Sequence, residues 1–355
     1  MSSIAVNAIT DANAGNTATI NSVTPNVNNV VGKNRIINGN MMIDQRNAGA
    51  SVTPASGAYT LDRFNATTVA GTGKFSVQQN AGAVTPPAGF TNYLGVTSLS
   101  AYSITAGDIQ LITQQIEGFN VSDLGWGTAN AKTVTLSFQV YSSLTGTFGG
   151  SLRNYDNNRS YPFSYSIPVA NTWTKISVTV VGDTSGTWYK NNSTGIAVSW
   201  GLGVGSTYST TAGAWAGALY GAPTGSVSVV GTSGATFYIT GVQLEAGSSA
   251  TEFEHRQYTT ELQLCSRYFW RQYNAGYNVI YDRVYWSGAG NNAIFSYPAP
   301  AGMRINAATV TCSPTTNGTS VSFTYMQFGL IQVYRATANG DNYLYAADIS
   351  ISAEL

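Results

Sequence analysis

Residues 133–143 read TVTLSFQVYSS, and this stretch decides the fold class. The apolar residues Val134, Leu136, Phe138 and Val140 alternate with Thr, Ser and Gln. An alternation of period two is typical of a β-strand with one buried face. Comparable stretches are WTKISVTVVGD (173–183), GIAVSWGLGVG (195–205), GSVSVVGT (225–232) and ATFYITGVQLEAG (235–247). Short strands joined by Gly, Asn and Ser predict two antiparallel sheets packed face to face, so we expect an all-β fold with a jelly-roll β-sandwich over residues 34–251.

The composition excludes several classes of partner. Only 9% of the 355 residues are charged, against about 25% in an ordinary soluble protein. Sixteen basic and sixteen acidic residues cancel, so no basic face is expected to collect nucleic acid or anionic lipid. No stretch reaches the roughly 18 apolar residues of a membrane span, and residues 1–33 lack the features of a signal peptide. We expect neither nucleic-acid binding nor membrane insertion.

Residues 1–33 contain no aromatic residue and almost no charge. Such a segment cannot bury enough apolar surface to fold alone. One alternative is a disordered tail. The other, favoured by the alternation in SIAVNAI (3–9), is an extended arm that docks on another protein by adding a strand to a sheet edge.

Residues 252–270 predict a short helical joint between two β regions. Tyr258, Leu262, Cys265 and Phe269 recur at spacings of four, three and four, which places them on one stripe of a helix of about three turns. The stripe could form the seam of a homotrimer, and we expect these four residues at the oligomer interface. The alternative is that the stripe lies on the chain's own sandwich.

Residues 271–355 return to strand patterns, in YNVIYDRVYW (277–286), NAIFSYPAP (292–300), ATVTCSP (308–314), SVSFTYMQFGLIQVYRA (320–336) and NYLYAADISISAEL (342–355). They predict a small C-terminal β domain. Cys265 and Cys312 could form one disulfide, but two Cys in a chain of this length make no disulfide framework. We expect thiols.

Few residues suit catalysis or metal binding. His255 is the single His, so any Ser/His/Asp or Cys/His arrangement would depend on it, and its place near a helix start favours a solvated or capping role. No Cys or His pair has zinc-ligand spacing. The stretch GLGVGS (201–206) matches a phosphate-binding motif only in its glycine spacing. A calcium site held by oxygen ligands stays open.

Polysaccharide hydrolysis would need two carboxyl groups flanking the scissile bond. The Asp residues instead occur singly among Asn, Gly and Ser, in contexts typical of turns: Asp156, Asp183, Asp282 and Asp341. We therefore predict a protein that is not an enzyme and that uses no cofactor and no bound metal.

Aromatic residues beside glycines are the stronger signal for binding. Trp188, Tyr189, Trp215 and Tyr220 occur in GTWYKN (186–191) and GAWAGALYG (213–221), where rings can be exposed and can stack on sugar faces. We name these four residues as candidate glycan contacts. The alternative is that the Trp residues belong to the core, as we expect for Trp126 and Trp173.

Several motifs together resemble a family of phage and prophage structural proteins, the tail fibre or receptor-binding proteins. They are NRIINGNMMIDQRNAG (34–49), YTLDRF (59–64), QQIEG (114–118), FYITGVQLEAGSSATEFEHR (237–256) and ELQLCSRYF (261–269). The opening SSIAVNAI (2–9) is similar to the start of such proteins in aquatic phages. The resemblance implies a jelly roll like those of carbohydrate-binding domains, carried on a homotrimeric virion protein. It identifies no sugar contacts. Release by host lysis is expected separately, because the composition is typical of extracellular and virion proteins while no export signal is recognised.

The expected function is therefore that of a tail fibre or receptor-binding protein of a phage. It would be anchored to other virion proteins through residues 1–33 and would attach to host cell-surface glycan. A head-decoration protein that stabilises the capsid is the main alternative, and a polysaccharide depolymerase is the third.

Overall fold

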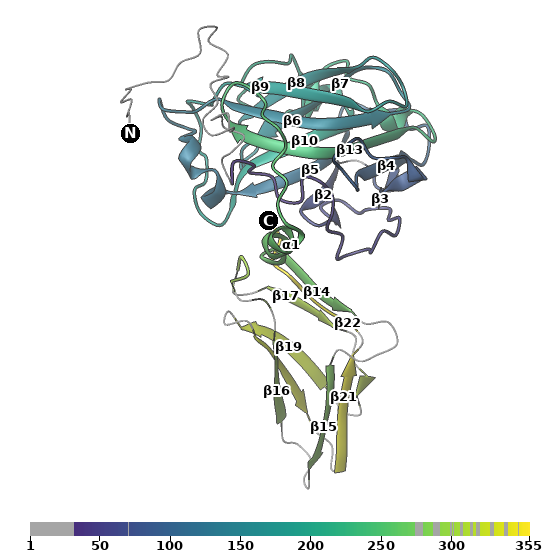
Figure 1. Cartoon of the computed structure of the whole chain (residues 1–355), viewed down its shortest axis with the longest axis vertical. Coiled ribbons are helices and arrows are strands. Elements are labelled where there is room, and N and C mark those ends of the chain that lie inside the picture. The colour runs from purple at the N-terminus through teal and green to yellow at the C-terminus, as the bar shows by residue number, and fades with distance from the viewer. Residues whose placement is uncertain are drawn as a thin grey trace, which may run out of the picture.

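The computed structural model describes residues 32–69, 71–273, 280–286, 292–298, 300, 302–305, 308–312, 315–316, 320–326, 330–336, 340–346 and 348–355. A large β-sandwich lies at one end and a narrower β domain at the other, with one short helix between them (Figure 1). The predicted arm comprises residues 1–33, of which residues 1–31 lie outside the described residues. Docking of the arm on another protein therefore stays a prediction.

The first layer of the sandwich is a six-stranded sheet in the order β1-β2-β5-β10-β7-β8. Every neighbouring pair in it is antiparallel. Its strands are β1 (Tyr59–Leu61), β2 (Phe64–Val69), β5 (Ile109–Glu117), β7 (Gly146–Arg153), β8 (Ser160–Ile167) and β10 (Thr194–Val204).

The second layer is a five-stranded sheet in the order β3-β4-β13-β6-β9, again antiparallel throughout. Its strands are β3 (Phe75–Gln79), β4 (Leu94–Ser98), β6 (Val134–Ser142), β9 (Thr174–Val180) and β13 (Thr236–Ala246). A parallel pair of very short strands, β11 (Ser209–Thr210) and β12 (Ala222–Pro223), lies beside the first sheet at β7 and β8.

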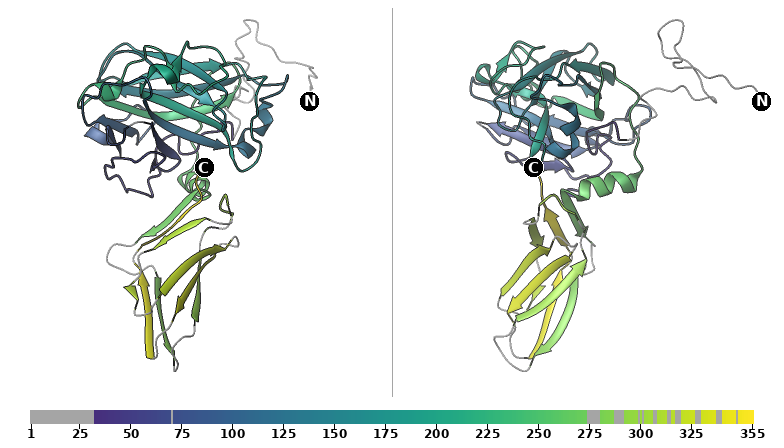
Figure 2. Two further views of the ribbon diagram at one scale, coloured as in Figure 1. Left: turned by 180° about the vertical axis from the view of Figure 1, so that it is seen from behind. Right: turned by 90° about the vertical axis from the view of Figure 1, so that its left-hand side faces the viewer.

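The core fills the space between the two sheets. Phe138 of β6 and Trp200 of β10 are almost fully buried, and their rings pack edge to face at 5.7 Å. Val134, Leu136 and Val140 are also fully buried, as the alternation predicts. The predicted all-β jelly-roll sandwich is thereby confirmed (Figures 1 and 2).

One predicted strand is wrong. Residues 225–232 form no strand but contain a single 3₁₀ turn, Val229–Gly231. Val229 and Val230 are both fully buried, although they are adjacent. A strand points neighbouring side chains to opposite faces, whereas this turn directs both residues into the same core.

The segment that follows the arm is an integral part of the sandwich. Its backbone pairs with β13, because Arg35 N–H donates to Leu244 O and Val242 N–H donates to Gly39 O, each at 2.9 Å. A side chain at Gly39 would clash with the Val242 carbonyl, since a Cβ would lie 2.1 Å from its oxygen. Asn38 adopts a left-handed φ of 59°. The motif at 34–49 is therefore structural.

Among the described residues, α1 (Tyr258–Ser266) is the only α-helix. It is shorter than the helical joint predicted over 252–270, because Phe269 and Trp270 already belong to strand β14 (Phe269–Tyr273). No helix in these ranges is long and apolar enough to cross a bilayer. The right-hand view of Figure 2 shows α1 lying across the junction of the two β bodies.

Two of the four residues of the predicted oligomer stripe, Cys265 and Phe269, are buried within the chain. Cys265 is fully buried and, with Leu262, packs against Ile37 and Ile43 of the segment that follows the arm. Phe269 is also buried, and the Arg46 guanidinium lies 3.7 Å from its ring centroid. Tyr258 remains 54% exposed. Cys265 and Phe269 are therefore covered by the chain itself and are not available to a trimer seam, and Cys265 lies against the segment that follows the arm.

The C-terminal domain consists of short antiparallel sheets, and every predicted stretch in it contains strand. Its strands are β14 (Phe269–Tyr273), β15 (Ile280–Trp286), β16 (Asn292–Pro298), β17 (Thr309–Cys312), β18 (Thr315–Thr316), β19 (Ser320–Met326), β20 (Leu330–Ala336), β21 (Gly340–Ala346) and β22 (Asp348–Ser352). β14 and β22 pair next to α1, with Phe269 opposite Ser352. Cys265 and Cys312 are both free thiols.

Buried ion pairs fasten this domain to the sandwich at a joint formed by α1, residues 267–268 and residues 353–355. Glu117, at the end of β5, accepts two hydrogen bonds from Arg267, at 2.8 and 2.6 Å, and one from the Tyr268 hydroxyl at 2.7 Å. Arg63 is 1% exposed, pairs with Glu354 and lies over the Tyr268 ring.

Candidate functional site

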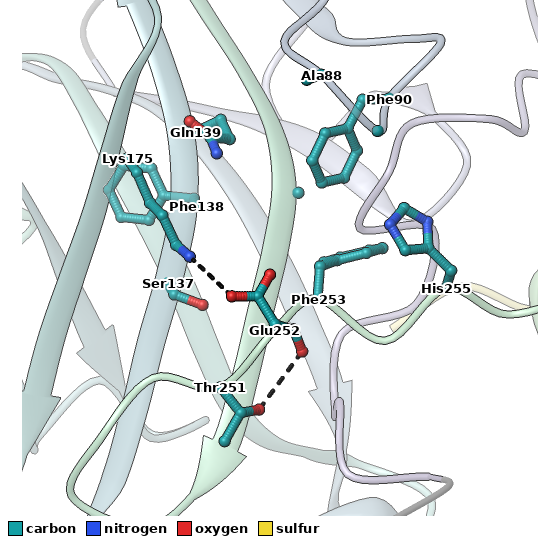
Figure 3. A pocket seen from close by; sticks show the side chains of 12 residues that line it. Ala88, Phe90, Ser137, Phe138, Gln139, Lys175, Thr251, Glu252, Phe253 and His255 are labelled. Carbon is teal, nitrogen blue, oxygen red and sulfur yellow. Dashed lines mark hydrogen bonds and ion pairs between the residues drawn. The ribbon is translucent and has the colours of Figure 1, made fainter. Parts of the chain in front are cut away.

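A cavity of about 260 Å³ opens on the outer face of the five-stranded sheet (Figure 3). Strands β6, β9 and β13 form its floor. The loop before β4 and the chain that leaves β13 form its sides. The lining residues are Ala88, Gly89, Phe90, Ser137, Phe138, Gln139, Lys175, Gly241, Thr251, Glu252, Phe253 and His255.

One side of the cavity is aromatic. Phe90 and Phe253 pack edge to face with ring centroids 5.1 Å apart, and His255 lies 5.4 Å from Phe90 and 4.9 Å from Phe253. Phe90 can approach the sheet only because residue 241 is Gly. A Cβ at Gly241 would lie 2.6 Å from the tip of the Phe90 ring, and the Gly241 φ of 61° also favours glycine.

The opposite side is polar. Gln139 of β6 lies directly across from Lys175 of β9, and Ser137 lies two residues earlier on the same face. The Lys175 ammonium lies 3.7 Å from a Glu252 carboxylate oxygen, and both side chains are more than half exposed. Figure 3 shows the rings of Phe90 and Phe253 facing this polar side across the opening.

A row of tyrosines continues the same sheet face beyond Gln139. Tyr141 stacks on Tyr238 at 5.3 Å with nearly parallel rings, and Tyr238 stacks on Tyr93 at 5.0 Å. Trp173 packs at 5.5 Å from both Tyr93 and Tyr141. Trp173, which was predicted to belong to the core, packs against a small buried cluster on this outer face and is itself half-buried.

This set of side chains is suited to binding a polar ligand that has one apolar face. Amide, hydroxyl and ammonium groups provide donors and acceptors, and the rings provide an apolar surface. Glu252 is the single carboxylate among the lining residues, whereas glycoside hydrolysis uses a pair. Within the described ranges, no three His, Cys, Asp or Glu residues cluster as metal ligands do.

The predicted glycan residues lie elsewhere, and none of the four lines the cavity. Trp188 is only 8% exposed and packs edge to face on Trp126 at 4.7 Å and on Trp215 at 5.4 Å. The expectation that the Trp188 ring is exposed is wrong, because this loop folds its Trp into the end of the core. The placement of Trp126 in the core agrees with its burial.

The other three candidates are partly accessible. Trp215 is half-buried on the same cluster, and its indole N–H donates to the Val181 carbonyl at 2.7 Å. Tyr189 is half-buried beside the exposed Tyr155, with ring centroids 5.5 Å apart. Tyr220 is half-buried in the segment between β11 and β12. The structure thus joins Trp188 to Trp215 but does not assemble all four residues into one site.

The cavity residues carried only a weak signal in the sequence. Phe253 and His255 fall in the segment predicted as helix, and His255 was expected to be solvated. It is indeed exposed, but it lies against two phenylalanines and three residues before α1 begins. Phe90 follows the turn-like PPAG (86–89), and no local pattern predicts that this loop reaches β13.

Comparisons with known proteins find similarity in structure alone. No family model matches the sequence, and no curated protein matches it. The enzymatically active domain of tailspike protein 4 of bacteriophage CBA120 is 14% identical with a TM-score of 0.33, and the match covers 61% of this chain and 22% of that chain.

Carbohydrate-binding modules are also similar. The family 11 module of Clostridium thermocellum, solved with a β-1,3-1,4-mixed-linked tetrasaccharide, is 12% identical with a TM-score of 0.27, and the match covers 58% of this chain and 98% of that one. TmCBM61, solved with β-1,4-galactotriose, is 9% identical with a TM-score of 0.29, over 60% of this chain and 99% of the module.

Proposed function

We propose that this chain is a non-enzymatic virion structural protein of a phage, of the tail fibre or receptor-binding kind, and that its sandwich binds host cell-surface glycan in the cavity described above. The observation that carries the glycan proposal is the aromatic side formed by Phe90 and Phe253 opposite the polar side formed by Gln139 and Lys175. The virion proposal is supported by the resemblance of the motifs.

A sugar unit fits the chemistry of this cavity. Its C–H face can lie on a phenylalanine ring, and its hydroxyls can reach the amide of Gln139, the hydroxyl of Ser137 and the ammonium of Lys175. The side chain of Gln139 forms no hydrogen bond within the described part of the chain, so it can bond a ligand without breaking an existing contact. The volume is slightly below the usual range for small-molecule sites and suits a single sugar unit.

The test is binding to an array of bacterial surface polysaccharides, followed by titration of the best ligand. Gln139→Ala and Phe253→Ala should each weaken binding about tenfold, the effect expected for a lost hydrogen bond or aromatic contact. Gln263→Ala on the exposed face of α1 and Phe119→Ala, at a Phe that is 58% exposed, are matched controls that should bind like wild type. Unchanged binding in both cavity variants would place the glycan site elsewhere.

The place in the virion needs a separate experiment. A density map of the particle would show whether the chain lies in a tail fibre or decorates the head, which is the main alternative. Release of sugar from host envelope by the purified protein would instead support a depolymerase.

We also propose that the chain forms a homotrimer through surfaces other than Cys265 and Phe269. Light scattering on the purified chain tests that oligomeric state.

A further inference from the structure

Arg153, at the end of β7, is a buried arginine without a carboxylate partner. Only 6% of the residue is exposed. Its guanidinium donates to the amide oxygen of Asn157 at 2.9 Å and to the Ser199 hydroxyl at 3.0 Å, and its Nε–H has no partner. The other buried arginine among the described residues, Arg63, pairs with Glu354. Burial lowers the pKa of Arg153 to about 10, with no opposing contribution from a nearby carboxylate.

The residues around Arg153 form a polar row on the outer face of the six-stranded sheet. Ser199 of β10 lies opposite Thr113 of β5 and Ser151 of β7. The hydroxyls of Thr113 and Ser199 are 2.9 Å apart, and the Ser151 hydroxyl is fully buried without a hydrogen-bond partner. Residues 151 and 153 point to the same face of the sheet because they are two positions apart on β7. The unpartnered donors of Arg153 and Ser151 therefore lie on one face.

A buried cation is normally paired with an acid, because removing it from water alone is costly. Asp156, in the adjacent turn, is exposed and accepts a hydrogen bond from Tyr189 at 3.4 Å. Asp183 is held by two bonds from Arg159, at 2.6 and 2.7 Å. In the part of the chain that the structure describes, no carboxylate forms an ion pair with Arg153.

We propose that Arg153 binds the carboxylate of an acidic ligand, a sugar acid or a small free acid, at a second site separate from the cavity of the proposed function. The turn at 155–158 is exposed, and we place the entrance there. In this proposal the ligand carboxylate takes the place of the Asn157 amide oxygen as the acceptor for the Arg153 guanidinium. It also accepts hydrogen bonds from the Arg153 Nε–H and from the Ser151 hydroxyl, neither of which has a partner. A planar carboxylate matches the guanidinium fork. The exposed ring of Tyr155 and the adjoining Tyr189 border this entrance and can contact a sugar ring.

The test titrates the full chain with sodium glucuronate, sodium acetate and inorganic phosphate, and follows Tm and the ¹⁵N–¹H resonance of Arg153 Nε. Glucuronate should shift this resonance and raise Tm by about 3 to 6 °C at ten times its Kd. Equal binding of acetate would identify a small free acid as the ligand, whereas preference for glucuronate would identify a sugar acid. Binding of phosphate alone would overturn the carboxylate assignment.

Two variants separate a ligand site from a purely structural arginine. Arg153→Gln should weaken glucuronate binding at least tenfold, with Arg35→Gln, at an arginine that pairs on the surface with Asp123, as the matched control. Asn157→Gly removes the competing amide oxygen, and its left-handed φ of 54° suits glycine, so the variant should bind glucuronate about threefold more tightly. If Asn157→Gly folds but neither it nor wild type binds glucuronate, Arg153 only holds the turn and the proposal fails.

Discussion

The contact between Glu117 and Arg267 should carry much of the coupling between the sandwich and the joint. Glu117 is 1% exposed and accepts three hydrogen bonds, two from Arg267 and one from Tyr268. The replacement Glu117→Gln keeps the shape of the side chain but removes its charge. It leaves the Arg267 guanidinium without a counter-ion at this position.

The expected cost follows from the burial of the two partners. Removing one member of a buried pair costs about 3 to 5 kcal/mol, because the remaining charge stays uncompensated. The Arg267 side chain is 36% exposed and keeps a bond to the Gly302 carbonyl at 3.0 Å, so water and this bond offset part of the loss. We therefore expect the free energy of unfolding to fall by about 2 to 4 kcal/mol.

The dependence on pH has a defined sign. Burial raises the pKa of Glu117, but the bonds from Arg267 and Tyr268 outweigh this effect and hold the pKa below its ordinary value. The stabilisation is therefore fully present above the unfolded-state pKa of about 4.3 and is lost as pH falls through the lowered value. The difference between wild type and Glu117→Gln should shrink in acid.

The assay is equilibrium urea unfolding at pH 7, followed by tryptophan fluorescence. Arg267→Met should lower the free energy of unfolding much less in the Glu117→Gln background than in wild type, since the two residues act as a pair. Asp123→Asn breaks the exposed pair with Arg35 and should cost under about 1 kcal/mol. A loss below about 0.5 kcal/mol for Glu117→Gln would refute the reasoning.

Three further predictions concern other parts of the chain. Burial raises the pKa of Asp62 to about 7, so the protonated carboxyl is favoured in the folded state and its contribution to the free energy of unfolding is full below about pH 4. This contribution falls by about 4 kcal/mol as pH rises to 7. Urea unfolding at pH 5 and pH 7.5 should show a smaller change in the free energy of unfolding for Asp62→Asn than for wild type, and an equal change in both proteins would contradict this. Trp188→Ala should lower stability by about 3 to 5 kcal/mol, measured as a fall in Tm, because it empties a buried site; an unchanged Tm would return this Trp to the surface. Deleting residues 1–33 should leave a folded β protein that no longer enters virions, and normal incorporation seen on protein gels of purified particles would exclude a docking arm.

Period-two patterns predicted most of the sandwich, because each strand buries one face. The predicted stretch 133–143 contains β6 (Val134–Ser142), and 195–205 overlaps β10 almost completely. The pattern failed at Val229 and Val230, where a turn buries two adjacent residues. The helix was predicted too long because its apolar stripe continues through Phe269, which is buried by a strand instead.

The candidate sites were less accessible from the sequence, since they depend on contacts between distant segments. The cavity brings residues 88–90 beside residues 251–255, and neither segment has a pattern that identifies the other. The Trp residues were prominent in the sequence, but a ring beside glycine is compatible with a surface position and with a core position. Trp188 is buried in the core. Arg153 carried no signal in the sequence, because Asp156 and Arg159 lie close to it along the chain and its lack of a carboxylate partner appears only in the fold.

The pairing of β14 with β22 has a consequence for how the C-terminal domain can be exchanged. The two strands are hydrogen-bonded neighbours, with Phe269 opposite Ser352, so the chain enters and leaves the C-terminal domain at points about 5 Å apart. A segment whose ends lie side by side can be exchanged as a cassette without altering the path of the flanking chain. Recombination between Tyr273 and Asp348 could therefore replace the distal domain in one step and leave the sandwich and its cavity intact, provided that the new segment restores the bonds that Gly302 and Arg304 form with Arg267 and with the Asn192 carbonyl.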